Sequence, residues 1–384
     1  MKRLEDQHLR RRLRMVDTEP GTSGTTIMID GRSLILLASN NYLGLAEHPS
    51  VKKAAVQATE RYGAGSGASR LISGSWPPHR DLEAALARFK QTDAALVFGA
   101  GYLANVGLIP ALVEKGDLIL ADRLSHASLI DGCRLSGADL RIFAHNDMGQ
   151  LDKLLNARSK DRRTLIVTEG VFSMDGDLAP LPDLIAIAER HGASVLVDDA
   201  HGTGVMGTHG RGTLEHFGVE ARLPFHMGTL GKALGTCGAY VAGRSDVIEY
   251  LLNTARSFLY ATAPPPGTMA ASTAALDVVA REPQRRARLW ANRDRLHTGL
   301  KRAGFRLTDS HSPILPVIVG DPDKAVAMAS RLLDHGVFAP AIRPPTVPKE
   351  TSRIRATVSS EHTSAQLDAA LAAFEKAGRA AGLI

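Results

Sequence analysis

The run Gly228-Thr229-Leu230-Gly231-Lys232-Ala233-Leu234-Gly235 places one lysine among three glycines and small or apolar neighbours. A lysine amine in such surroundings is desolvated, which lowers its pKa and makes it a nucleophile. The glycines allow a flat ligand to approach the backbone closely. A phosphate-binding loop of the Walker type does not fit, because His226 stands where the first glycine is required and Ala233 where Ser or Thr is required. A solvated lysine in a glycine loop is the alternative, so the rest of the chain decides the role of Lys232.

Length and composition predict a globular protein of about two domains. The chain has 384 residues, of which 44% are hydrophobic and 22% charged, and these are ordinary values for a soluble protein. The two cysteines, Cys133 and Cys237, lie far apart in sequence, which argues against a disulfide framework and predicts a reducing, cytoplasmic location. We find no apolar run of about 18 residues and no apolar signal core in residues 1–6, so we expect no membrane span.

The net charge of +6 raises the question of nucleic-acid binding. Part of the excess lies in one stretch that contains Arg10, Arg11, Arg12 and Arg14. Aromatic residues make up only 5% of the chain, which leaves few side chains on which bases could stack. We therefore expect no nucleic-acid partner, because an anionic small-molecule substrate explains the arginines as well.

Short apolar segments alternate with segments of helical periodicity through the first two thirds of the chain. We predict strands at 94–98, 118–121, 140–144, 165–168 and 194–197, and helices at 49–62, 81–90, 104–112 and 183–190. Strands this short and apolar, separated by helices, predict an α/β fold with a mainly parallel sheet covered on both faces. Before them we expect a basic helix over residues 1–20 and two short strands at 25–29 and 33–38.

The last third of the chain has a different pattern. A helical region over 247–300 leads out of the sheet, and short strands at 305–307, 314–319 and 353–358 then alternate with helices at 324–335 and from 364 onwards. We therefore divide the chain into an N-terminal segment (residues 1–48), a large domain (residues 49–285) and a smaller α+β C-terminal domain (residues 286–384).

Polar residues follow the predicted strands at the edge of the sheet where such folds bind ligands. These residues are Gly101, Tyr102, His126, Ser173, Asp198 and His201. Each of them alone has a simpler explanation, such as a turn hydroxyl, a helix cap or a structural histidine. The functional hypothesis depends on all of them lying at one end of one sheet.

A lysine, an aspartate and two histidines at one sheet edge are typical of a pyridoxal 5′-phosphate site. Lys232 can form a Schiff base with the aldehyde, and Asp198 can keep the pyridine nitrogen protonated so that the ring becomes an electron sink. His126 can stack on the ring face. Ser173 and His201 can donate to the phenolic oxygen of the cofactor. Thr229 and the backbone amides of Gly101 and Tyr102, at a helix N-terminus, can bind its phosphate.

Two other ligand classes fit the sequence less well. Residues 202–207 match the dinucleotide pattern G-x-G-x-x-G after a strand, but residues 208–212 cannot open the long helix that binds pyrophosphate. Residues 63–68 match it as well, but they follow a helix. Asp198, Asp199 and His201 lack a partner His or Cys pair at metal spacing, so we expect no metal. A basic binding module without catalysis is the alternative outside the enzymes.

The chain resembles the α-oxoamine synthases, which are pyridoxal-phosphate enzymes of fold type I, the aspartate-aminotransferase-like fold. The matching runs cover nearly the whole chain in order: 39–45, 99–105, 122–128, 168–177, 197–204, 228–235 and 353–355. The run Pro-Ala-Ile-Arg-Pro-Pro-Thr-Val-Pro at 340–348 looks like the branch that condenses L-alanine with a pimeloyl thioester, carried by coenzyme A or by acyl carrier protein, with loss of carbon dioxide and the free thiol. A sister enzyme that uses glycine and a shorter acyl-CoA is the alternative.

The resemblance also implies roles for individual residues. Lys232 would be the Schiff-base lysine and the proton-transfer base, Asp198 would pair with the pyridine nitrogen, and Arg355 would bind the amino-acid carboxylate. Thr346 and Arg343 would face the acyl substrate. From spacing alone, Arg353 and Arg355 share one face of a strand, a pattern normally typical of solvent exposure, and only the resemblance singles out Arg355.

Three further assignments follow from the resemblance. The family has a substrate-contacting arginine near the N-terminus, for which we choose Arg11, and Asn40 and His126 complete the substrate-binding set. The family enzymes are homodimers with sites built at the interface, so we expect a homodimer. Thr262 is the candidate for reaching the phosphate in the partner subunit.

Overall fold

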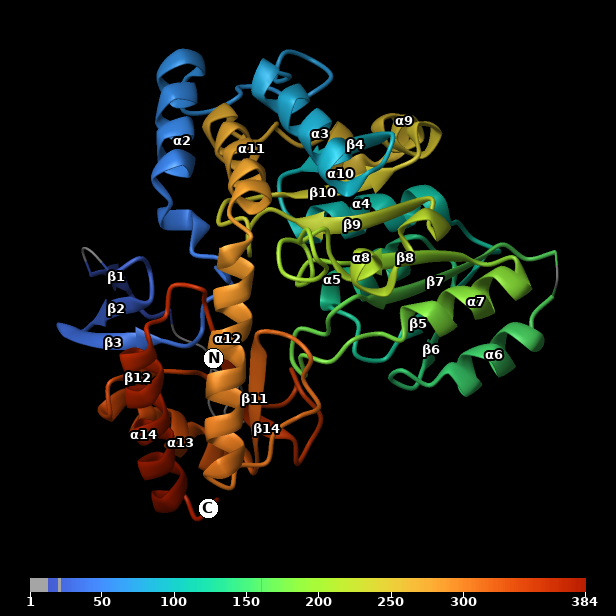
Figure 1. The fold of residues 1–384 in the computed structure, drawn as a ribbon. Helices are drawn as coiled ribbons and strands as arrows, with labels where there is room; N and C mark the ends of the chain where they lie inside the picture. Colours follow the sequence, from blue (N-terminus) through green and yellow to red (C-terminus); the bar gives the residue numbers. More distant parts are fainter. Residues whose placement is uncertain (1–12, 20–21, 160) are drawn as a thin grey trace, which may run out of the picture.

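A seven-stranded sheet organises the computed structural model, which describes residues 13–19, 22–159 and 161–384 (Figure 1). Its order is β4-β10-β9-β8-β7-β5-β6. The bounds are β4 (Ala94–Phe98), β5 (Leu118–Asp122), β6 (Asp139–Phe143), β7 (Thr164–Glu169), β8 (Ser194–Asp198), β9 (Phe225–Thr229) and β10 (Ala239–Gly243). Only β10 runs antiparallel to its neighbours, β4 and β9. The predicted mainly parallel α/β sheet is therefore confirmed.

Helices cover both faces of this sheet because its strands are apolar on both sides. The alternation along β5 shows the two layers: Ile119 and Ala121 pack in one core cluster, and Leu118 and Leu120 pack in another. The first layer holds α4 (Gly101–Leu112), α5 (Ala127–Leu135), α9 (Ser245–Thr254) and α10 (Arg256–Leu259), and the second holds α6 (Met148–Asn156), α7 (Leu181–His191) and α8 (Thr213–Phe217). The polar residues that follow the strands lie at the sheet edge between these two layers, where a ligand can reach them.

Two helices precede the sheet in the chain, and a third packs against both. Helix α2 (Pro49–Tyr62) has the predicted bounds, whereas α3 (Pro77–Lys90) begins four residues before the predicted start. Proline is tolerated in the first turn of a helix, so the pair Pro77-Pro78 opens α3 rather than preceding it. Helix α11 (Pro266–Arg281) packs against α2 and α3.

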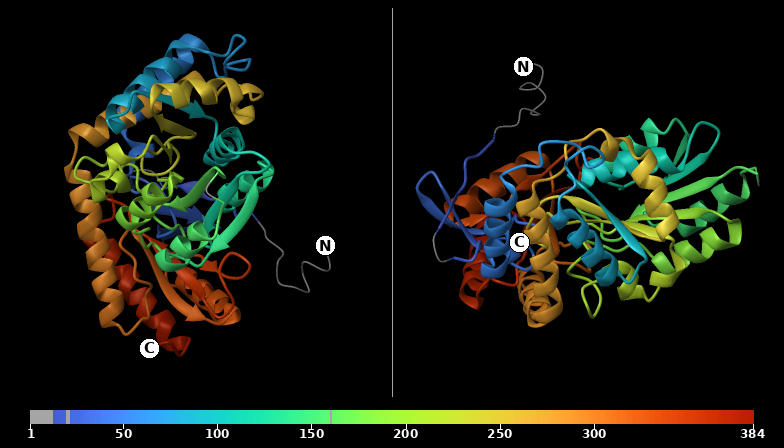
Figure 2. Two further views of the ribbon diagram at one scale, coloured as in Figure 1. Left: turned by 90° about the vertical axis from the view of Figure 1, so that its right-hand side faces the viewer. Right: turned by 90° about the horizontal axis from the view of Figure 1, so that it is seen from above.

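The N-terminal segment joins the C-terminal part of the molecule in a second sheet. Its order is β1-β2-β3-β12, with β1 (Asp17–Thr18), β2 (Thr26–Ile29), β3 (Arg32–Leu36) and β12 (Val337–Phe338). Figure 2 shows the N-terminal strands beside the C-terminal helices from two further directions. The expected helix over 1–20 is wrong at its described end, because residues 17–18 pair with β2 as a strand; residues 1–12 lie outside the described part.

A third sheet forms the centre of the C-terminal part, in the order β11-β14-β13. The bounds are β11 (Ile314–Gly320), β13 (Ala341–Ile342) and β14 (Ser352–Thr357), covered by α12 (Gln284–Arg302), α13 (Pro322–Asp334) and α14 (Ser364–Ala380). The strand expected at 305–307 is only an isolated bridge between Leu307 and Val317. The proposed boundary at residue 285 falls in the first turn of α12, and the division into domains stays a prediction.

The position of β14 corrects one expectation from spacing. Because β14 is the central strand of its sheet, all six of its residues are buried, including Arg353 and Arg355. The solvent exposure suggested by the alternation of these two arginines is therefore wrong. Among the helices of the described residues, none is long and apolar enough to cross a membrane.

Candidate active site

Arg355 connects the small sheet to the loops that leave the large one. Its side chain is buried, and its Nε donates to the backbone oxygen of Ser173 at 2.7 Å. Its Nη2 lies 3.5 Å from Oδ1 of Asn40. The predicted carboxylate-binding arginine, the predicted phenol-binding serine and the predicted substrate-binding asparagine are therefore neighbours, although they come from three separate parts of the chain.

Lys232 follows β9 and is surrounded by charged groups from three other segments. Desolvation by burial lowers the pKa of the Lys232 amine; the carboxylates of Asp198 and Glu169 oppose this shift, and the guanidinium of Arg355 adds to it. A lowered pKa favours the neutral amine, which is the form that acts as a nucleophile and a base. The glycine-rich run thus places its amine among the other candidate groups.

Asp198, at the end of β8, has both carboxylate oxygens fixed by hydrogen bonds. Oδ2 accepts from Nδ2 of Asn105 at 2.8 Å, and Oδ1 accepts from the backbone N–H of Ala200 at 3.0 Å. Asn105 is fully buried in α4. Since a carboxylate only accepts, the atom of Asn105 that faces it is the amide nitrogen.

The same amide nitrogen begins a chain of hydrogen bonds that reaches His126. Asn105 Nδ2 donates to Oγ of Ser128 at 2.9 Å, and that oxygen lies 2.8 Å from Nδ1 of His126. His126 also caps α5, because its Nδ1 accepts from the backbone N–H of Ser128 at 3.2 Å. Nδ1 is therefore an acceptor, so the neutral ring carries its proton on Nε2. Desolvation lowers the pKa of His126, as does nearby Lys232, which favours that neutral form.

His201 belongs to a second hydrogen-bonded chain. Its Nδ1 lies 2.8 Å from the hydroxyl of Tyr42, and this hydroxyl lies 3.2 Å from Oδ1 of Asn40. Burial holds the pKa of His201 well below its usual value, and the charges of Lys232 and Arg355 lower it further. The ring is therefore neutral, with its Nδ1 occupied by Tyr42.

Asn105, Ser128, Tyr42 and Glu169 are site residues that we did not assign from the sequence, although all four lie in or beside the matching runs. Glu169 ends β7, is buried, and has one carboxylate oxygen without a hydrogen-bond partner among the described residues. Burial raises its pKa to about 8, the charge of Asp198 raises it too, and Lys232 opposes the shift. One available signal was Asn105, a polar residue in an otherwise apolar helix, since a buried amide requires a partner.

Asp198 and its neighbour Asp199 have different surroundings. The Asp199 carboxylate is fully buried, lies 3.6 Å from Nζ of Lys90 and accepts from Oγ1 of Thr213 at 2.7 Å. Lys90 also donates to the backbone oxygen of Arg211. Asp199 is thus committed to a buried ion pair behind the sheet edge, whereas Asp198 is linked to His126.

The residues predicted to hold a phosphate lie at the N-terminus of α4 and the end of β9. Helix α4 begins at Gly101, and its cap residue Ala100 has no side chain that could accept a hydrogen bond. Tyr102 is half exposed, and its hydroxyl donates to Oδ2 of Asp131 at 2.7 Å. The Thr229 hydroxyl donates to the backbone oxygen of Gly238 at 2.9 Å. The first amides of α4 are therefore the donors that an anion would meet.

A cavity of about 470 Å³ extends from this edge of the sheet. His126, Ser173 and Thr346 are among its lining residues, and its apolar walls include Leu124, Ile130, Phe172, Met174 and Val347. The predicted substrate residue Thr346 therefore lines the same cavity as two of the predicted cofactor residues, His126 and Ser173. Arg343 lies next to it, with its backbone oxygen accepting from the N–H of Thr346 at 3.1 Å.

The remaining expectations have different outcomes. Arg11 lies outside the described residues. Thr262 is exposed and forms an isolated bridge with Ser69. In the run 202–207 the chain turns back on itself, since the N–H of Gly204 donates to the oxygen of Gly210 at 2.7 Å, and α8 after it has five residues. Within the described ranges, no group of three or more His, Cys, Asp or Glu residues is placed to hold a metal ion.

Comparison with known proteins gives a consistent result. The family described as Aminotransferase class I and II matches residues 32–374. The 8-amino-7-oxononanoate synthase of Geobacter sulfurreducens is 50% identical, with 100% of this chain and 98% of that protein covered. The synthase of the same name from Symbiobacterium thermophilum is also 50% identical, with 93% and 91% covered.

Solved structures of similar fold carry two different names. Serine palmitoyltransferase from S. paucimobilis with bound PLP-myriocin has a TM-score of 0.95 at 38% identity, with 100% of this chain and 96% of that chain covered. The 8-amino-7-oxononanoate synthase from Francisella tularensis has a TM-score of 0.79 at 29% identity, with 90% and 98% covered.

Proposed function

Since the chain belongs to the aminotransferase class I and II family, and within it to the 8-amino-7-oxononanoate synthases, we propose that it is an acyltransferase that condenses L-alanine with a pimeloyl thioester. The products are 8-amino-7-oxononanoate, carbon dioxide and the free thiol, and the reaction is a step of biotin biosynthesis. The observation that carries this proposal is the 50% identity to synthases of that name over the full chain. The glycine-using alternative is not favoured, because those relatives carry the name of the alanine-dependent branch.

The residues at the sheet edge fit pyridoxal 5′-phosphate. They offer an amine of lowered pKa at Lys232, a carboxylate held by two hydrogen bonds at Asp198 and an uncapped helix N-terminus at Gly101. When bound, the cofactor supplies an electron sink for bond cleavage at the amino acid's α-carbon. Asp198 would hold the proton of the pyridine nitrogen, and Lys232 would hold the aldehyde end.

The phosphate and ring contacts are divided among the remaining cofactor residues. The backbone amides of Gly101 and Tyr102, with Thr229, would bind the phosphate at the positive end of α4. His126 would stack on the ring, and Ser173 and His201 would donate to the phenolic oxygen. His201 would donate from Nε2 in the tautomer whose Nδ1 accepts from the Tyr42 hydroxyl, 2.8 Å away.

Arg355 and Lys232 act on the amino acid. Because Nε of Arg355 is engaged by Ser173, the alanine carboxylate would bind at the Nη1 and Nη2 end of the guanidinium. This contact would orient the amino acid's α-carbon for bond cleavage. Lys232, whose pKa is lowered by burial, would remove the α-proton and return a proton after decarboxylation.

The cavity beside His126 is the proposed site of the pimeloyl chain. Its volume of about 470 Å³ is in the usual range for small-ligand pockets, and apolar side chains form part of its wall. Thr346 would contact the acyl group, and Arg343, Asn40 and Arg11 complete the proposed substrate residues. The thioester carrier is coenzyme A or acyl carrier protein.

We also propose a cytoplasmic homodimer. Two large apolar side chains close in sequence to the Ser69–Thr262 bridge are unusually exposed, Ile72 at 80% and Tyr260 at 73%. An exposed apolar patch of this kind is typical of a surface that a partner covers, and Thr262 would then reach the partner's phosphate. The unpaired cysteines, Cys133 and Cys237, suit a reducing compartment.

The test is an amino-acid and thioester matrix. Purified protein loaded with pyridoxal phosphate is offered alanine, glycine or serine with pimeloyl, acetyl or palmitoyl thioesters, and thiol release and product mass are measured. We expect alanine with pimeloyl thioester to be turned over at least tenfold more efficiently than any other pair. Preference for serine with a palmitoyl thioester, or for glycine with the acetyl thioester, would instead assign the chain to a sister activity.

A further inference from the structure

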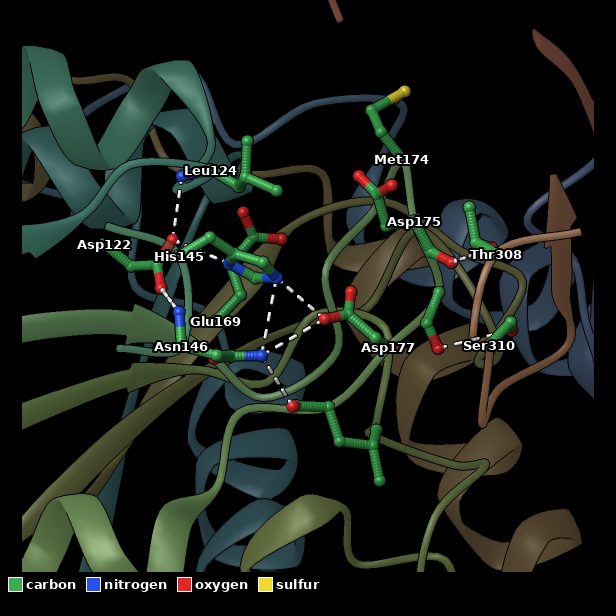
Figure 3. Close-up of polar contacts among 12 residues, drawn as sticks. Asp122, Leu124, His145, Asn146, Glu169, Met174, Asp175, Asp177, Thr308 and Ser310 are labelled. Atoms are coloured by element: carbon green, nitrogen blue, oxygen red, sulfur yellow. Dashed lines mark hydrogen bonds and ion pairs between the residues drawn. The ribbon is translucent and has the colours of Figure 1, made fainter. Parts of the chain in front are cut away.

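His145 lies between β6 and α6 and contacts one carboxylate at the end of β5 and one in the loop after β7. Its Nδ1 lies 3.0 Å from Oδ1 of Asp122, and its Nε2 lies 2.7 Å from Oδ2 of Asp177 (Figure 3). Carboxylates only accept hydrogen bonds, so both ring nitrogens carry protons and the ring is a cation. Burial lowers the pKa of His145, but the hydrogen bonds and charges of Asp122 and Asp177 together raise it to about 10.

The Asp122 side of this contact fixes the turn that leads to His126. Asp122 is fully buried at the end of β5, and its Oδ1 also accepts from the backbone N–H of Leu124 at 2.8 Å. Its Oδ2 accepts from the N–H of Asn146 at 2.9 Å, and its backbone oxygen accepts from Ser125 at 3.0 Å. Asp122 therefore fixes the residues just before His126 through hydrogen bonds, and His145 in turn contacts the Asp122 carboxylate.

The Asp177 side closes the loop that carries Ser173. The backbone oxygen of Asp177 accepts from the N–H of Phe172 at 3.0 Å, and Asn146 Nδ2 donates to its carboxylate at 3.1 Å. The His145 ring packs edge-on against Phe172, with 4.4 Å between ring centroids. The second carboxylate oxygen of Asp177, Oδ1, is buried without a partner among the described residues. The His145 cation is therefore the charge that stabilises the Asp177 carboxylate.

The C-terminal part holds the far side of the same loop. Arg353 Nη1 lies 3.0 Å from the backbone oxygen of Met174 and 2.5 Å from Oδ1 of Asp175. Thr308 Oγ1 donates to the backbone oxygen of Asp175 at 2.7 Å (Figure 3). Arg355 holds the backbone oxygen of Ser173. A displacement of this loop would therefore move the phenol-binding and carboxylate-binding groups together.

We propose that His145 is a positioning residue for the condensation: its cation ties the turn before His126 to the Ser173–Asp177 loop and so fixes the distance between the ring-stacking and phenol-binding groups. The proposal rests on the function proposed above. His145 acts through Asp122 and Asp177. Without the cation the two carboxylates would face each other, and the two loops would separate.

The test variant is His145→Gln, and the matched control is His191→Gln. His191 Nε2 lies 3.0 Å from Oδ1 of Asp152, and its side chain is 17% exposed against 20% for His145, but this pair joins α7 to α6 away from the cavity. We expect His145→Gln to lower kcat by about ten- to a hundredfold, the loss typical when a catalytic group is displaced. The alanine dissociation constant, titrated through the absorption of the bound cofactor, rises severalfold, and the circular dichroism of that absorption band changes. His191→Gln loses thermal stability only.

Two outcomes would overturn the proposal. The first is that the kinetic constants and cofactor dichroism of His145→Gln match those of His191→Gln. The second is that the effects of His145→Gln and Asp177→Asn add in the double variant. Asp177→Asn keeps the shape of the loop while removing its charge, so it remains informative if His145→Gln fails to fold. We expect Asp177→Asn to show the same changes, and His145→Gln/Asp177→Asn to show no more than either single variant. If the wild type itself does not turn over alanine with pimeloyl thioester, the proposed function fails, and the dichroism comparison still tests the positioning role.

Discussion

Asn105 Nδ2 lies 2.8 Å from Oδ2 of Asp198, and both residues are buried. One end of this contact is the carboxylate proposed to meet the cofactor nitrogen, and the other lies in the helix whose N-terminus is proposed to hold the phosphate. The same amide nitrogen continues through Ser128 to His126. Asn105 therefore couples the orientation of the carboxylate to that of the stacking histidine.

Replacing Asn105 tests this coupling. In Asn105→Leu, Oδ2 of Asp198 loses its hydrogen-bond donor. Leaving a buried charged group without its partner costs about 1–3 kcal/mol or more. We expect bound cofactor to be retained while kcat falls about ten- to a hundredfold. Steady-state kinetics and the cofactor's absorption spectrum measure the two effects.

A matched control exists in α12. Asn292 Nδ2 donates at 2.9 Å to the backbone oxygens of Ser359 and of His362. Asn292→Leu is expected to lower the melting temperature with little change in kcat. Equal kinetic losses at the two positions would mean that Asn105 only supports the fold.

The pair Asp198 and Asp199 separates catalysis from stability. Asp198→Asn removes the charge proposed to stabilise a protonated ring nitrogen, so we expect loss of most activity with the fold intact. Asp199→Asn instead leaves Lys90 buried without its counter-charge, which costs about 3–5 kcal/mol of unfolding free energy while activity per folded molecule is kept. Urea unfolding beside active-site titration distinguishes the two, and a reversed pattern would exchange their roles.

The sequence predicted the sheet and most of the site because both depend on local signals. Short apolar runs marked the strands, and polar residues directly after them, such as Asp198 and His126, identified the ligand edge. The bounds of α3 were missed because Pro77 and Pro78 interrupt the pattern that they in fact begin.

What the sequence could not show depends on contacts between distant residues. Asn105 and Asp198 are 93 positions apart, and Tyr42 and His201 are 159 apart. A periodic pattern spans far fewer residues, so it cannot contain both residues of either pair. The burial of Arg353 and Arg355 depends on β14 lying between β11 and β13, and alternation along one strand cannot tell a central strand from an edge strand. The chemistry of single residues was thus accessible, and their supporting partners were not.

Arg355 and Arg353 are expected to respond differently to the same change. Arg355→Lys loses a paired, charge-assisted contact with the alanine carboxylate, which costs about 1.5–3 kcal/mol, or roughly ten- to a hundredfold in alanine affinity. Arg353 is bound to Asp175 and the oxygen of Met174, so Arg353→Lys should lower stability and change alanine affinity much less. Alanine titration through the cofactor spectrum measures both variants. Equal loss of affinity in the two variants would place the carboxylate contact elsewhere.

The pH dependence of stability gives an independent measure of His145. Its pKa is raised in the folded protein to about 10, against about 6.5 in the unfolded chain. The folded state therefore binds one more proton between these values, so the contribution of His145 is complete below about pH 6.5 and is lost as the pH rises through about 10. The charged groups that contact the ring are Asp122 and Asp177.

The measurement is the difference in unfolding free energy between the wild type and His145→Gln, by urea denaturation at pH 6, 8 and 10. We expect this difference to be largest at pH 6 and to shrink steadily towards pH 10, because only the wild type loses a folding-linked proton over that interval. Glu169, whose pKa burial raises to about 8, titrates in both proteins and cancels in the difference. A difference that stays constant across the three pH values would mean that the folded and unfolded states bind the same number of protons at His145, and a difference that grows from pH 6 to pH 8 would mean that the ring is neutral in the folded state; either result contradicts the cation.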